Sequence, residues 1–120
     1  MRTSMVKAIL GYDLVEGVHK EDYERWLWEV HVPDLLANPY LDRLVFNTVV
    51  RPVLSTSAGS PTAREPETFY RIAELHFADH EAYERYLEWF REHPIPPERG
   101  PAGRTEFRFY VLTESVEASR

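Results

Sequence analysis

Histidines are the side chains of this sequence best suited to acid–base chemistry, and His31 is singled out by its position. It ends an aromatic-rich stretch with helical spacing and comes two residues before Pro33. The C-terminal end of a helix favours the charged form of an imidazole, and an imidazole that titrates near neutrality can give or accept a proton. We therefore predict His31 as a catalytic acid or base. The alternative is that His31 caps the last helix carbonyls or makes a hydrogen bond across a dimer interface.

A second group of candidates lies on the predicted third strand. Tyr70, Glu74 and His76 have the same strand parity, so we expect them to share one face of a sheet. If that face borders a cavity, Tyr70 and His76 are further catalytic candidates and Glu74 contacts the substrate. The alternative is that Glu74 pairs with His76 or with Arg108 and fixes the strand register.

The remaining candidates are predicted to bind a substrate. Glu106, Arg108 and Tyr110 are expected to share one face of the last strand, where Arg108 can hold a carboxylate or enolate through charge-assisted hydrogen bonds. The alternative is an edge strand that is kept polar to prevent aggregation. Three further predicted substrate contacts are Trp28, Asn47 and His93. For Trp28 the alternatives are a dimer contact or packing beneath a loop.

Composition removes several classes of function. The chain has no cysteine, which excludes disulfides, thiol nucleophiles, iron–sulfur clusters and the usual structural zinc sites. Neither a metal-ligand spacing nor a Gly-rich phosphate loop, serine nucleophile elbow or dinucleotide fingerprint is present, so we expect no metal and no organic cofactor. A net charge of -6 argues against nucleic acid and anionic membranes as partners. No apolar run is long enough to span a membrane and no signal peptide is recognisable, which favours the cytoplasm.

The elements that must position these residues follow from hydrophobic periodicity and breaker residues. We expect a single domain over residues 1–120, because 120 residues suit one hydrophobic core. Asp79 is the expected N-cap of the second helix. The predicted elements are a strand at 6–14, a helix at about 19–32 that stops or kinks near Pro33, a strand at 41–51, a flexible loop at 53–67, a strand at 68–78, a helix ending at Pro94, a strand at 105–113 and a frayed tail at 115–120.

This order predicts an α+β fold of the ferredoxin-like βαββαβ type, with a four-stranded antiparallel sheet and both helices on one face. The strands are apolar on both parities, whereas a strand with one solvated face alternates between apolar and polar residues. We therefore expect a partner on the uncovered face. The simplest partner is a second copy, which gives a homodimer packed sheet against sheet.

The stretch at residues 23–33 (YERWLWEVHVP), followed by LVFN at 44–47, resembles the EthD-like branch of the dimeric α+β-barrel superfamily. The second helix end, EHP at 92–94, is similar to the His-Pro turn of stress-responsive barrel proteins and plant polyketide cyclases. The resemblance implies a dimeric barrel with a cavity in each protomer. Its relatives include cofactor-free monooxygenases, lactone isomerases, cyclases, haem-degrading enzymes and proteins without shown activity, so it implies no single reaction.

From these observations we expect a small cofactor-independent enzyme of the monooxygenase, isomerase or cyclase type. Its expected substrate is a hydrophobic aromatic or polyketide-like molecule, with His31 as the acid or base. The alternative is a non-catalytic EthD-like accessory or ligand-binding protein that supports a catabolic or biosynthetic enzyme.

Overall fold

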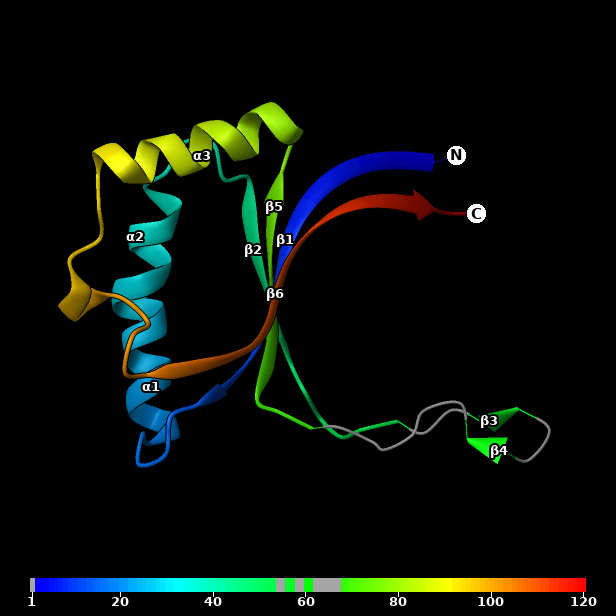
Figure 1. Ribbon diagram of the computed structural model, residues 1–120, viewed down its shortest axis with the longest axis horizontal. Helices are drawn as coiled ribbons and strands as arrows, with labels where there is room; N and C mark the ends of the chain where they lie inside the picture. The colour runs from blue at the N-terminus through cyan, green and yellow to red at the C-terminus, as the bar shows by residue number, and fades with distance from the viewer. Residues whose placement is uncertain (1, 54–55, 58–59, 62–67) are drawn as a thin grey trace.

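The computed structural model describes residues 2–53, 56–57, 60–61 and 68–120. Figure 1 labels its helices and strands. In chain order the elements are β1 (Arg2–Leu14), α1 (Lys20–Trp26), a π-helical segment (Leu27–His31), α2 (Val32–Leu36), β2 (Arg43–Thr48), β3 (Thr56–Ser57), β4 (Ser60–Pro61), β5 (Arg71–Phe77), α3 (His80–Glu92), a 3₁₀ turn (Pro97–Arg99) and β6 (Thr105–Ala118). The short strands β3 and β4 pair within the predicted loop 53–67, and the rest of that loop after residue 53 lies outside the described residues.

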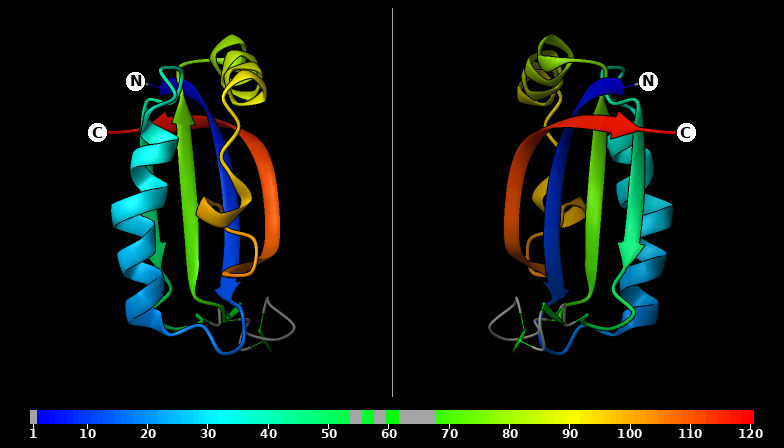
Figure 2. Two further views of the ribbon diagram at one scale, coloured as in Figure 1. Left: turned by 90° about the vertical axis from the view of Figure 1, so that its left-hand side faces the viewer. Right: turned by 90° about the vertical axis from the view of Figure 1, so that its right-hand side faces the viewer.

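Four strands form one antiparallel sheet in the order β2-β5-β1-β6. The helical segment from α1 to α2 and the helix α3 lie on the same face of this sheet, and in the described part of the chain no helix covers the other face (Figure 2). We call these the covered face and the open face. The predicted α+β class and ferredoxin-like topology are confirmed.

The core forms where alternate strand residues meet the helices on the covered face. Val6, Ala8, Leu10 and Tyr12 of β1 are buried, and their partners on β5 include the buried Phe77. Because successive strand side chains point to opposite faces, the intervening residues of both strands belong to the open face. The sheet therefore presents a packed apolar face to the helices and a separate set of side chains to the other side.

The first helical region runs without a break through Pro33, where the sequence predicts a stop or a kink. Proline lacks an N–H, and its ring crowds the carbonyl of the residue four positions earlier. The wider π-helical turn over Leu27–His31 lies directly before this point and accommodates the proline. His31 consequently lies inside a continuous helical region that ends at Leu36, rather than at a helix C-terminus.

One extra residue in β6 changes which of its side chains share a face. Gly11 pairs with Phe109, but the next residue, Tyr12, pairs with Phe107, so Arg108 is the additional residue of a β-bulge. Such a bulge shifts the alternation by one position. The predicted shared face of Glu106, Arg108 and Tyr110 is therefore wrong, because Tyr110 pairs with Leu10 and lies on the covered face.

The start of α3 agrees with the sequence prediction, whereas β6 is longer than predicted. The Asp79 side chain accepts a hydrogen bond from the Ala82 N–H at 2.8 Å, as expected of an N-cap. Strand β6 continues to Ala118 and pairs with β1 along its length, well beyond the predicted end at Thr113. Figure 1 shows this paired ribbon bending away from the helices toward the chain termini. None of the helices in the described part of the chain has the length and apolar content needed to cross a bilayer.

Candidate functional site

A cavity of about 240 Å³ lies between the α1–α2 helical region and the covered face of the sheet. All four strands of the main sheet contribute to its lining, as do α3 and the segment before β6. Its walls are mostly aliphatic and aromatic, and among the described residues that line it none is an Asp, Glu, Lys or Arg. The cavity is slightly smaller than a typical site for a drug-sized ligand. It therefore suits a compact, uncharged aromatic molecule.

His31 is the titratable imidazole of this cavity. Its ring stacks on the indole of Trp26, with the ring centroids 4.7 Å apart. Its Nδ1 is buried and has no hydrogen-bond partner among the described residues. Burial lowers the pKa of His31 to about 4; Asp34 opposes this effect, and Arg104 adds to it. The predicted preference for the charged form is therefore wrong, because the ring is desolvated and lies within the helix instead of at its end.

The connector at residues 97–104, which we call the strap, borders the cavity through Pro101. The Trp26 indole N–H donates a hydrogen bond to the Arg99 carbonyl at 3.1 Å. The Arg99 guanidinium donates two hydrogen bonds to the Asp34 carboxylate, each 2.9 Å long, and this pairing holds the pKa of Asp34 below its usual range. The strap is thus attached to the same helical region that carries His31.

Two tyrosines, Tyr12 and Tyr23, line another part of the cavity. The Tyr23 hydroxyl donates to the Tyr12 hydroxyl at 2.8 Å, and burial raises the pKa of both phenols, so both stay protonated near neutrality. Behind them, the buried Arg71 donates to both carboxylate oxygens of Glu24 at 3.0 Å. The Tyr70 hydroxyl donates to the same carboxylate at 2.9 Å. This part of the site therefore combines protonated phenols with a partly buried ion pair.

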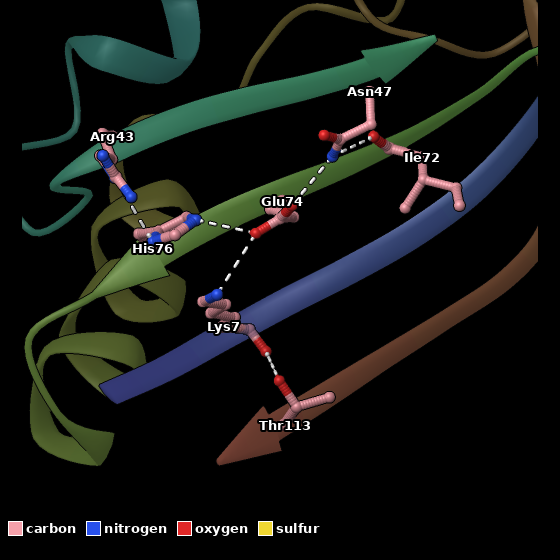
Figure 3. A network of polar contacts seen from close by, with 7 residues as sticks. All are labelled: Lys7, Arg43, Asn47, Ile72, Glu74, His76 and Thr113. Carbon is pink, nitrogen blue, oxygen red and sulfur yellow. Dashed lines mark hydrogen bonds and ion pairs between the residues drawn. The ribbon is translucent and has the colours of Figure 1, made fainter. Parts of the chain in front are cut away.

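A different set of polar residues lies on the open face, where the Glu74 carboxylate makes hydrogen bonds and an ion pair with several neighbours (Figure 3). The Asn47 amide donates to Glu74 at 2.8 Å, His76 Nε2 lies 3.0 Å away and Lys7 Nζ 3.4 Å away. The other ring nitrogen of His76 accepts from Arg43 at 3.4 Å. Burial works against ionisation of Glu74, but the Asn47 amide and the His76 ring hold its pKa below the usual range. We call these five residues the open-face network.

The predicted shared face of Tyr70, Glu74 and His76 is wrong for the tyrosine. Tyr70 precedes β5, and its ring meets the Tyr23 ring edge-on at 5.8 Å on the covered side of the sheet. It contacts a wall of the cavity without being one of its lining residues. His76 and Glu74 belong to the open face and therefore do not reach the cavity that His31 lines.

The other predicted substrate contacts are dispersed. Tyr110 lines the cavity. Trp28 is about half exposed and packs edge-on against Phe46, whose ring lies in the lining. Arg108 pairs with Asp13 at 3.5 Å. Asn47 belongs to the open-face network. His93 stacks on Trp89, with centroids 4.3 Å apart, and lines a separate hollow of about 160 Å³.

Sequence reasoning missed four residues that shape this site, namely Tyr12, Tyr23, Trp26 and Arg71. The aromatic spacing of the first helix assigns Tyr23 and Trp26 to the core but does not reveal a cavity beside them. Arg71 falls on a strand parity that is otherwise apolar, which was the available signal for a partly buried ion pair. Within the described residues, no three His, Asp or Glu side chains converge as metal ligands would.

Comparison with known proteins identifies the fold. No protein-family model matches the chain, and no curated protein sequence matches it. Among solved structures, an EthD-like protein from Ralstonia eutropha aligns with a TM-score of 0.53 and 15% identity, over 94% of this chain and 91% of that protein. A DABB family protein with a ferredoxin-like fold from Mesorhizobium loti aligns with a TM-score of 0.52 and 15% identity, over 98% of this chain and 100% of that protein.

A dimeric ferredoxin-like protein of unknown function from Thermobifida fusca also aligns, with a TM-score of 0.52, 15% identity and coverage of 93% and 90%. The chain therefore has the fold of EthD-like and dimeric ferredoxin-like proteins, in agreement with the resemblance found in its sequence. At such low identity the similarity establishes the fold, and function has to be argued from the site.

Proposed function

We propose that the protein binds a hydrophobic aromatic or polyketide-like molecule in the cavity beside His31. We further propose that it acts as a small enzyme of the monooxygenase, isomerase or cyclase type, without a metal or an organic cofactor. The observation that carries this proposal is the buried Nδ1 of His31, which has no partner among the described residues and lies at a cavity with mostly aliphatic and aromatic walls. A buried polar atom without a partner is costly, and a ligand that donates a hydrogen bond to it removes that cost.

In this proposal His31 acts in its neutral form. With a pKa of about 4 the imidazole carries no proton on one nitrogen at neutral pH, so it is available to accept one from a phenol or an enol. The stacked Trp26 restrains the ring at 4.7 Å between centroids. Tyr110, on the β6 side of the same cavity, is proposed as a further substrate contact.

We propose that the protein works as a homodimer through its open face. Phe109 and Val111 lie on this face and are 37% and 48% exposed, which is unfavourable for apolar side chains on a sheet that has no further layer. The dimeric description of the Thermobifida fusca neighbour fits this arrangement. In such a dimer the open-face network, centred on Glu74 and His76, lies at the interface and fixes the sheet-to-sheet register.

A non-catalytic ligand-binding or accessory role is the second candidate. The observation that favours it is the environment of His31, since its buried Nδ1 has no hydrogen-bond partner among the described residues. A catalytic imidazole is commonly oriented by such a partner. This candidate predicts the same ligand in the same cavity, but without turnover.

The two candidates can be separated in one experiment. Native mass spectrometry of the purified protein reports the mass of the assembly and any retained small molecule. The molecule is extracted, identified and incubated with the wild-type protein and with His31→Gln. An enzyme converts it, and the variant binds but loses turnover. Binding without conversion by the wild type supports the accessory role, and turnover unchanged in the variant contradicts the assignment of His31.

The location of the ligand needs its own control. Ala73 is buried on β5 and lines the cavity, so Ala73→Leu places additional carbon atoms in the proposed ligand space. We expect this variant to lose most of the binding while its circular dichroism spectrum is retained. Full binding by a folded Ala73→Leu variant would contradict the cavity as the site.

A further inference from the structure

The hydroxyl of Tyr12 has an unused hydrogen-bonding capacity. Its oxygen accepts a hydrogen bond from the Tyr23 hydroxyl at 2.8 Å, and a phenol can both accept and donate a hydrogen bond. With Tyr23 as the donor of that bond, the Tyr12 hydroxyl donates no hydrogen bond to any other side chain or backbone group of the described residues. Tyr12 is 3% exposed and lines the cavity, so bulk water is a poor alternative acceptor. An acceptor inside the cavity would use this proton.

The surroundings of Tyr12 strengthen it as a donor. Its oxygen receives a hydrogen bond from Tyr23, and a phenol that accepts a hydrogen bond is polarised toward donating its own proton. The positive charge of Arg71 lies close enough to oppose the burial that raises the pKa of Tyr12. Glu24 fixes the guanidinium through two hydrogen bonds of 3.0 Å. The Tyr12 hydroxyl therefore lies beside a fixed, partly buried ion pair and is bound to Tyr23.

The donor and His31 lie at different positions along the same cavity. Tyr23, which contacts Tyr12 directly, precedes His31 on the helical region, and the intervening rise is roughly 11–12 Å. Trp26 lies between them, with its ring 5.5 Å from Tyr23 and 4.7 Å from His31. The cavity therefore has a hydrogen-bond donor on β1, Tyr12, near one end, an acceptor on the helical region, His31, near the other, and the aromatic ring of Trp26 between them.

We infer that Tyr12 is a specificity-determining residue that donates a hydrogen bond to a carbonyl oxygen of the ligand, while His31 accepts one from a hydroxyl at the other end. This inference rests on the proposed function, and it narrows the ligand class to planar hydroxyaryl carbonyl compounds. Tyr12 and His31 together would fix which end of the molecule faces the imidazole. A ligand bound in the reverse direction would place its carbonyl acceptor against the acceptor nitrogen of His31.

The test uses three probes of one shape and isothermal titration calorimetry. 6-Acetyl-2-naphthol carries both groups, 2-naphthol has the hydroxyl alone, and 2-acetylnaphthalene has the carbonyl alone. We expect Tyr12→Phe to weaken the two carbonyl probes about tenfold and to leave 2-naphthol within about twofold. His31→Leu should show the opposite selectivity and weaken the two hydroxyl probes.

Tyr23→Phe is the matched control, because it removes a hydroxyl from the same part of the cavity. Its hydroxyl donates to Tyr12 rather than to the ligand, so we expect a smaller change than for Tyr12→Phe. Equal weakening of all three probes by Tyr12→Phe, or no weakening, overturns the inference. The same conclusion follows if Tyr23→Phe alone produces the carbonyl-selective loss.

A comparison of two ligands on the wild-type protein does not depend on whether a variant folds. In 6-isopropenyl-2-naphthol a methylene group replaces the carbonyl oxygen of 6-acetyl-2-naphthol, and the wild-type protein should bind it about tenfold more weakly. Equal affinity for the two molecules contradicts the role of Tyr12. If none of the probes binds the wild type, or if Ala73→Leu leaves their binding unchanged, the proposed cavity site fails as well. Failure of the inference alone leaves cavity-dependent binding intact.

Discussion

The histidines on the two sides of the sheet differ in how their ring nitrogens are hydrogen-bonded. On the covered face His31 has a buried ring nitrogen without a partner among the described residues. On the open face both ring nitrogens of His76 are engaged, Nε2 with Glu74 at 3.0 Å and Nδ1 with Arg43 at 3.4 Å. A satisfied network stabilises structure, whereas an unsatisfied buried group requires an explanation in function. The contrast separates a residue that is available to a ligand from one already used by the fold.

The largest expected effect is on turnover of the molecule extracted from the native protein. His31→Gln should lower kcat by about 100-fold or more, in line with the usual contribution of a positioned acid or base. His76→Gln, the matched control on the open face, should leave kcat within about threefold. The measurement is steady-state kinetics of both purified variants. A larger loss in His76→Gln than in His31→Gln would reverse the comparison.

The next effect is on stability as a function of pH. The folded-state pKa of His31, about 4, is below its ordinary value of 6.5, so the unfolded chain takes up the proton first as the pH falls. The contribution of neutral His31 to the free energy of unfolding is therefore complete above pH 6.5 and is lost progressively toward pH 4. Between pH 6.5 and 4.5 we expect a loss of about 1–2 kcal/mol, allowing for the partial exposure of the ring.

Urea unfolding of the wild type and of His31→Gln checks this prediction. The variant should lack this part of the pH dependence. The lowered pKa values of Glu24, Asp34 and Glu74 act at lower pH, because carboxylate contributions are lost only as the pH falls below their ordinary value of about 4. Parallel pH profiles for the two proteins would mean that His31 is not buried in its neutral form.

A smaller effect is expected from the open-face network. Glu74→Gln removes the charge that Lys7 and His76 contact and should cost about 1 kcal/mol of unfolding free energy. It should also weaken the proposed dimer, which sedimentation velocity can measure at several concentrations. Cavity binding of 6-acetyl-2-naphthol should stay unchanged. A selective loss of binding in this variant would connect the two faces and contradict their separation.

The smallest effect concerns the strap. Arg99→Gln removes the paired hydrogen bonds to Asp34, but the guanidinium is about half exposed, so the loss in stability should be small. Because the strap borders the cavity, we expect a two- to fivefold faster dissociation of bound 6-acetyl-2-naphthol, as measured by stopped-flow fluorescence. An unchanged dissociation rate would show that the strap does not restrain the ligand.

The sequence predicts the fold class well because the strand and helix periods agree with the breaker residues around them. It singles out His31 as a candidate but predicts neither its position within the helix nor its charge state. Pro33 indicates a helix end, which would favour a protonated imidazole. The π-helical turn over Leu27–His31 instead carries the helix through the proline. Neither this turn nor the desolvation of the ring can be inferred from residue types alone.

Two predictions of which sheet face a side chain lies on, for Tyr110 and Tyr70, are wrong because of local irregularities in the strands. Strict alternation groups Tyr110 with Arg108, and the bulge at Arg108 separates them. Tyr70 lies before the first residue of β5, where the sheet alternation no longer applies, and its hydroxyl is bound to Glu24 instead. The sequence therefore contains the correct residue types, but irregularities of a single residue decide which of them line the cavity.

The most direct test of the central claim is the NMR signal of the two imidazoles during titration with 6-acetyl-2-naphthol. The His31 and His76 resonances are assigned with His31→Gln and His76→Gln. We predict that the ring nitrogen shifts of His31 change with ligand concentration while those of His76 stay constant, and that His31 in the free protein remains neutral down to about pH 4. Ligand-dependent shifts confined to His76, with His31 unperturbed, would contradict the account and place the site on the open face.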